Sequence, residues 1–171
     1  MRKLMIAGVL GALLIPIGTA RADHDLNRRN PPRVRLMHQG EVVQRASAWS
    51  YCWSYSTDEW GVGQCADGFP SYPAAAAIEG PDRVVLRIPY SAKPKRLGII
   101  AYRKIRREGG WDEPIGRGER LEHTLKPHRV QGHVSAWDAI FRLDNDGRHY
   151  YLDVNTRLYQ GDPSYALHAP T

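Results

Sequence analysis

Residues 137–154 read WDAIFRLDNDGRHYYLDV, which is two alternating segments joined by a polar turn. Every second residue from Trp137 to Leu143 is apolar, and the same holds from Tyr150 to Val154. A period of two is typical of a strand with one buried face. The DNDG sequence between the segments is a strong turn signal. This stretch predicts a strand, a turn and a second strand, and it decides the fold class.

Further strand candidates lie on both sides of this stretch, in residues 33–37, 41–52, 83–88, 95–105, 121–130 and 164–168, and the alternation recurs in 33–37, 83–88 and 95–105. Pro89 stops the segment 83–88, which predicts a strand at the edge of a sheet. Residues 106–120 contain four Gly and one Pro and predict a long loop. Residues 74–77 are either one helical turn or a linker. Seven or eight short strands, with no amphipathic helix of ten residues, predict an antiparallel β-sandwich of unassigned strand order.

The turn before Tyr150 resembles a corner found in immunoglobulin-like domains. In those domains a Tyr that follows the turn into the sixth strand bonds through its hydroxyl to the backbone before the turn. The resemblance implies an all-β fold, an antiparallel immunoglobulin-like β-sandwich. The cysteines differ from those of immunoglobulin domains, because a separation of twelve residues favours one local disulfide over a bridge between sheets.

Cys52 and Cys65 are the two cysteines of the chain. An even number of cysteines in an exported chain predicts a disulfide, which stabilises a fold by about 3 kcal/mol for a loop of this length. Trp and Tyr residues on either side predict an aromatic-lined hairpin closed at its base by this bridge. The alternative is a reduced cysteine that acts as a nucleophile or metal ligand.

The segment around the cysteines carries a second resemblance. Tyr51-Cys52-Trp53 is followed by Cys65-Ala66-Asp67 and then by the Pro-rich residues 69–73. This signature is similar to that of uncharacterised exported bacterial β-sandwich domains, and the similarity covers residues 44–73. It implies an exported β domain and no particular activity.

Residues 1–22 have the three parts of a secretory signal peptide. A basic start precedes fifteen uncharged residues, and an A-x-A pattern ends at Ala22. We expect cleavage after Ala22 and a secreted or extracytoplasmic protein with no transmembrane anchor, the alternative being an uncleaved anchor. Residues 23–33 then form a flexible lead, and residues 34–171 form a single β-sandwich domain. Cleavage removes three positive charges and no acid, so the net charge falls from +6 to +3, and we expect no nucleic-acid partner.

Two groups of residues are candidates for ligand binding. Exposed aromatic rings stack on sugars, although rings beside a disulfide commonly pack against it. A cluster of arginines attracts polyanions, although most charge runs are solvated loop ends. The candidate ligand-binding residues are Trp53, Tyr55, Trp60 and Trp111 for a glycan and Arg103, Arg106 and Arg107 for an anionic polymer.

No metal, cofactor or catalytic motif is predicted. His123, His128 and His133 recur every five residues, and odd spacing sends neighbours in a strand to opposite faces. The sequence lacks a G-x-S-x-G elbow, an H-E-x-x-H helix and a phosphate-binding Gly loop.

These features together predict a non-catalytic binding or cell-surface-associated module, with a cell-envelope glycan or anionic polymer as its partner. One alternative is a small secreted glycoside hydrolase or other polysaccharide-active enzyme, which needs two facing carboxylates. The other alternative is a polyanion-binding surface protein.

Overall fold

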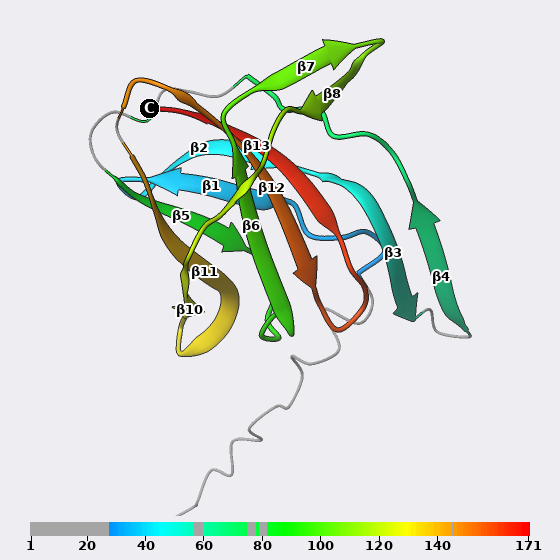
Figure 1. Cartoon of the computed structure of the whole chain (residues 1–171). Helices are drawn as coiled ribbons and strands as arrows, with labels where there is room; N and C mark the ends of the chain where they lie inside the picture. The colour runs from blue at the N-terminus through cyan, green and yellow to red at the C-terminus, as the bar shows by residue number, and fades with distance from the viewer. Residues whose placement is uncertain (1–27, 57–59, 75–77, 79–81, 145) are drawn as a thin grey trace, which may run out of the picture.

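The computed structural model describes residues 28–56, 60–74, 78, 82–144 and 146–171, which form two large antiparallel sheets packed as a sandwich (Figure 1). The first sheet has the strand order β10 (Thr124–Val130), β11 (His133–Leu143), β5 (Asp82–Ile88), β1 (Val34–His38) and β2 (Glu41–Ala46). The second has the order β4 (Gly61–Ala66), β3 (Ala48–Ser56), β13 (Ser164–Pro170), β12 (His149–Arg157), β6 (Arg96–Tyr102) and β9 (Glu119–Arg120). Strands β7 (Ile105–Glu108) and β8 (Trp111–Pro114) form a separate hairpin.

The core lies between the two sheets and is filled by alternate residues of each strand. Val84 and Leu86 on β5 and Ile99 on β6 have no exposed surface, and the same is true of Leu152 on β12. Burial of a side chain of this size contributes about 1.5–3 kcal/mol. The alternation read in the sequence therefore gives the inward face of the sheets correctly, and the predicted all-β sandwich is confirmed.

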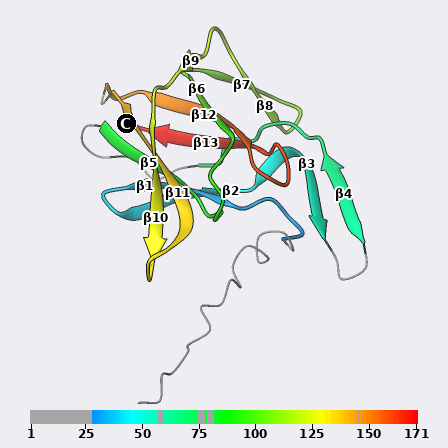
Figure 2. The ribbon, with the colours of Figure 1, turned by 90° about the horizontal axis from the view of Figure 1, so that it is seen from below.

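The strand order is that of an immunoglobulin-like domain. Strands β10, β11, β5 and β1 lie side by side as strands D, E, B and A do, and β13, β12 and β6 follow the order G, F, C. Figure 2 shows the two layers and the β3–β4 hairpin extending from one side. Strands β2, β3 and β4 are an insertion between the first two strands of the immunoglobulin order.

The Tyr corner expected at the turn after β11 is present. The Tyr150 hydroxyl accepts a hydrogen bond from the Asp144 backbone N–H at 2.9 Å. Strands β11 and β12 belong to different sheets, so this hydrogen bond fixes the point where the chain crosses from one sheet to the other. The Arg103 guanidinium lies 3.7 Å from the Tyr150 ring centroid and covers it.

The disulfide between Cys52 and Cys65 joins β3 to β4 near the open end of their hairpin. The two residues are directly opposite each other, with their Cα atoms 4.0 Å apart. This confirms the predicted local bridge. Strand β4 pairs with β3 alone, so the bridge and one ladder of hydrogen bonds hold the edge of the second sheet.

Three expectations about elements need correction or lie outside the described residues. Strand β5 is central in its sheet, between β11 and β1, so the prediction of an edge strand was wrong. Pro89 comes after the last residue of β5 and therefore ends the strand without affecting which strands pair with it. Residues 106–120 are not one loop, because Gly109 and Gly110 adopt positive φ and turn β7 into β8. The proline that is found within a strand, Pro127, lies in β10 at the edge of the sheet. Residues 75–77 lie outside the described residues.

Candidate anion-binding face

The outer face of the five-stranded sheet carries a row of charged side chains that crosses all its strands. Arg45 on β2 lies directly opposite Arg35 on β1, which in turn lies opposite Arg87 on β5. Asp138 on β11 continues the row beside Arg87, and Lys126 on β10 completes it. Neighbouring strands are about 4.8 Å apart, so the row is about 19 Å long.

Two further arginines stand on the same face. Arg83 on β5 and Arg142 on β11 are directly opposite each other. Each is four residues along its strand from the first row, so the two rows are about 13 Å apart. Between them lies an apolar row, in which Met37 faces Val85 and Val85 faces Ile140. The arginine face is defined here by its six cations: Arg35, Arg45, Arg83, Arg87, Lys126 and Arg142.

Strand alternation puts these cations outside. Val84, Leu86 and Ile88 point into the core, so the intervening residues Arg83 and Arg87 must point to solvent. The same alternation acts on every strand of the sheet. The pattern that builds the core therefore builds the charged face as its other side.

Five of the six cations have no acid to balance them. The Arg87 guanidinium donates two hydrogen bonds to the Asp138 carboxylate, at 2.7 and 2.9 Å, and the first of these raises the pKa of Arg87. Among the residues that the structure describes, the other five cations are exposed and have no ion-pair partner: Arg35, Arg45, Arg83, Lys126 and Arg142. The face is therefore strongly positive.

The register places like charges directly against one another. Arg35 is opposed by Arg45 on one side and by Arg87 on the other, and Arg83 is opposed by Arg142. Each such pair lowers the stability of a sheet by less than about 1 kcal/mol. An anion bound between two guanidinium groups would remove this repulsion and accept hydrogen bonds from both.

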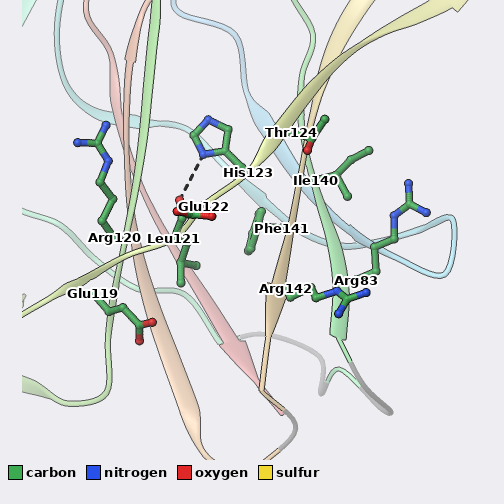
Figure 3. A pocket seen from close by; sticks show the side chains of 10 residues that line it. All are labelled: Arg83, Glu119, Arg120, Leu121, Glu122, His123, Thr124, Ile140, Phe141 and Arg142. Atoms are coloured by element: carbon green, nitrogen blue, oxygen red, sulfur yellow. Dashed lines mark hydrogen bonds between the residues drawn. The ribbon is translucent and has the colours of Figure 1, made fainter.

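A groove of about 630 Å³ adjoins the arginine face where the two sheets open (Figure 3). Arg83 and Arg142 belong to both surfaces, and Figure 3 shows them on the same side of the groove. Glu119, Glu122 and His123 line it as well, from β9 and the segment that leads to β10. The groove is therefore mixed in charge, whereas the sheet face is positive.

The arginines singled out in the sequence do not form an open cationic patch. Arg103 makes ion pairs with Asp146 at 3.2 Å and Asp144 at 3.7 Å, next to the Tyr corner. Arg106 and Arg107 are exposed on β7, but each lies within 4 Å of an acid. Their partners are Glu108 and Glu113 for Arg106 and Asp112 for Arg107.

The four aromatic candidates lie in four different surroundings. Trp53 is 1% exposed and belongs to the core, where its indole N–H donates to the Arg28 carbonyl, so its ring is not available to a ligand. Tyr55 lines a hollow of about 340 Å³ with Tyr159. Trp60 is 74% exposed beyond the end of β3. Trp111, on β8 of the β7–β8 hairpin, packs against Phe69 with ring centroids 5.0 Å apart.

The outer face of the second sheet holds a cluster of titratable groups that sequence reasoning did not single out. The buried Tyr72 hydroxyl donates to the Asp153 carboxylate. Burial raises the pKa of Asp153, and burial with this hydrogen bond raises that of Tyr72. The His149 Nδ1 and His168 Nε2 atoms are 2.9 Å apart, so the two rings are within hydrogen-bond distance of each other.

These contacts fasten a loop to the sheet. The Tyr72 backbone N–H donates to Asp112 on β8, and the Tyr72 ring meets that of Tyr151. The Tyr151 ring stacks on His168 with centroids 4.6 Å apart. Each polar member thus has a packing partner, and the cluster ties residues 70–74 and the β7–β8 hairpin to β12 and β13.

Within the described ranges, no three His, Cys, Asp or Glu side chains gather where they could hold one metal ion. His123, His128 and His133 remain separate, and His128 lies 3.8 Å from Asp138. No helix in the described part of the chain has the length and hydrophobicity needed to cross a membrane.

Comparison of the chain with protein-family models, with curated proteins and with solved structures found no match. The function is therefore inferred from the chemistry of the surfaces described above.

Proposed function

We propose that this protein is an exported, non-catalytic module that binds an anionic polymer of the cell envelope through its arginine face. The observation that carries the proposal is the set of five exposed cations without acidic partners on one side of one sheet. Such a surface attracts anions over several ångströms and holds them by release of counterions.

Arginine suits this role better than lysine would. Its planar guanidinium presents paired N–H groups to the oxygens of a phosphate, sulfate or carboxylate. Five of the six cations on the face are arginines. The rigid sheet fixes their Cα positions, so little backbone conformational entropy is lost when a ligand binds.

Export is proposed on two grounds. Residues 1–22 have the pattern of a signal peptide, and the Cys52–Cys65 disulfide is of a kind that persists in oxidising compartments. Mass spectrometry of the protein recovered outside the cytoplasm should give a chain that begins at Asp23. A full-length chain recovered from the cytoplasm with both thiols reduced would contradict export.

The test of anion binding compares two sets of variants. The quadruple variant Arg35→Ser, Arg45→Ser, Arg83→Ser, Arg142→Ser should bind immobilised heparin about tenfold more weakly or worse at low salt. The double variant Arg106→Ser, Arg107→Ser is the control, because it removes two exposed arginines that already have acidic partners. Binding of the native protein should fall steeply as salt increases. Equal losses in the two sets, or no binding by the native protein, would reject the proposal.

A polysaccharide hydrolase remains the second prediction. The groove of Figure 3 contains two carboxylates, Glu119 and Glu122, and both are exposed. Release of reducing ends from the polymers that bind the protein would favour this alternative over a binding module.

A further inference from the structure

The ligand class follows from what lies between the arginines. Val85 and Ile140 are half-buried in the strip between the two cationic rows, and Met37 is 8% exposed beside them. These side chains are shorter than arginine. A ligand that spans the two rows, about 13 Å apart, must therefore cover an apolar strip while its anions reach guanidinium groups on both sides.

A polymer whose backbone is itself made of charged groups, such as polyphosphate, suits this strip poorly. An anion held over Val85 and Ile140 would lose water and gain no hydrogen bond, which is unfavourable. A sugar ring can lie there instead, because its C–H groups tolerate an apolar surface and its anionic substituents project to the sides.

The adjoining groove favours the same ligand. The groove is lined by Arg120 as well as by Arg83 and Arg142, so it can take an anionic group, while its two carboxylates, Glu119 and Glu122, repel neighbouring phosphates and accept hydrogen bonds from sugar hydroxyl groups. The His123 Nδ1 atom lies 3.3 Å from the Leu121 carbonyl oxygen, which leaves Nε2 as the ring's other polar atom. The groove thus offers both acceptors and cations.

Resting on the proposed function, we infer that the arginine face binds an acidic polysaccharide whose sugar rings cover Val85 and Ile140. Its anionic groups contact the two cationic rows, and its hydroxyl groups reach Glu119 and Glu122 at one end. Polyphosphate, single-stranded DNA and anionic lipid surfaces share the charge of this ligand but lack its hydroxyl-bearing sugar rings.

The experiment measures the dissociation constants of the full mature chain for polygalacturonate and for polyphosphate of matched charge. Val85→Thr with Ile140→Thr should weaken polygalacturonate binding roughly threefold and leave polyphosphate binding unchanged. Glu119→Gln with Glu122→Gln should weaken binding of polygalacturonate and strengthen binding of polyphosphate. Val130→Thr is the control, because Val130 is 47% exposed outside the apolar strip.

The outcomes separate this inference from the proposed function. Tighter binding of polyphosphate, of single-stranded DNA or of vesicles rich in phosphatidylglycerol would overturn the inference while leaving an anion-binding face. Unchanged polygalacturonate binding in both pairs of variants would overturn it as well. Circular dichroism of each variant shows whether it folds; if the double Thr variant does not, Val85→Thr alone gives the same comparison. Loss of binding to every anion would instead reject the proposed function.

Discussion

Arg35 is the residue on which the charge argument is simplest. It stands between Arg45 and Arg87 in the register of the sheet, and Asp138 neutralises Arg87 alone. Arg35 and Arg45 thus face each other with no acid in contact among the described residues, which is unfavourable for folding. A residue that opposes stability and remains exposed is more readily explained by ligand binding than by the fold.

This arrangement predicts opposite effects on stability and binding. We expect Arg35→Thr to raise the free energy of unfolding by about 0.5 kcal/mol at low salt, because repulsion is relieved, and to weaken heparin binding. The gain should shrink at high salt. Arg157→Thr is the control, since Arg157 lies 3.7 Å from Asp162 and should not become more stable. Urea unfolding at two salt concentrations measures both variants; a loss of stability in Arg35→Thr would contradict the argument.

His168 gives a prediction about pH. Burial, and next the charge of the nearby His149, lowers the pKa of His168 below its ordinary value of 6.5. The unfolded chain therefore binds a proton at a higher pH than the native chain does, and stability falls as the pH drops through 6.5 toward the native pKa. The full stability is present only above pH 6.5, where His168 is neutral in both the native and the unfolded chain.

We expect the urea concentration at the unfolding midpoint to decrease as the pH is lowered from about 7.5 to about 5.5, and to decrease less in His168→Gln. His133→Gln, at the exposed start of β11, should keep the native pH dependence. Identical pH profiles for native protein and His168→Gln would show that this histidine does not control stability in that range.

At the scale of elements, Gly161 joins the inserted hairpin to the sandwich. It lies in the turn between β12 and β13, and it forms an isolated bridge with Trp53. The Asp162 backbone N–H donates to the Cys52 carbonyl at 3.3 Å. The backbones approach so closely here that a Cβ at Gly161 would collide with the Cys52 carbonyl oxygen.

Gly161→Ala should therefore destabilise the protein by about 1–3 kcal/mol, because the colliding atoms belong to the backbone and cannot rotate away. Gly63→Ala on β4 is the matched control, since a Cβ there meets nothing within 4 Å. Thermal unfolding should show a lower midpoint for the first variant and no decrease for the second. Equal midpoints would mean that the hairpin and the turn are not coupled.

The strands also show what the sequence could and could not predict. Alternation in 83–88 correctly gave the buried side of β5, and Arg83 and Arg87 on its other side were readable in the same pattern. What joined them to Arg35, Arg45 and Arg142 was the pairing register, which depends on long-range contacts. The prediction favoured Arg103, Arg106 and Arg107 because they are neighbours in sequence, and the structure gives each an acidic partner.

At the scale of the whole molecule, the proposed binding face lies on the outer side of one sheet, and the loop held by Tyr72 lies against the outer side of the other. The Tyr corner was indicated by the turn before Tyr150, since the corner needs only local sequence, whereas the strand order depends on long-range pairing and was not predicted. The central position of β5 in its sheet could not be predicted, since Pro89 affects only the chain that follows the strand and not the choice of neighbouring strands. Segregation of charge onto one sheet follows from topology, which brings β1, β5 and β11 together.

The most direct test of the arginine face is a titration of the isotopically labelled protein with heparin fragments, followed by nuclear magnetic resonance of backbone amides and arginine Nε–H groups. Shifts should concentrate on β1, β2, β5 and β11, with the Nε–H signals of Arg35, Arg45, Arg83 and Arg142 moving most. Shifts confined to the β3–β4 hairpin or to Arg106 and Arg107 on β7 would contradict the proposed site.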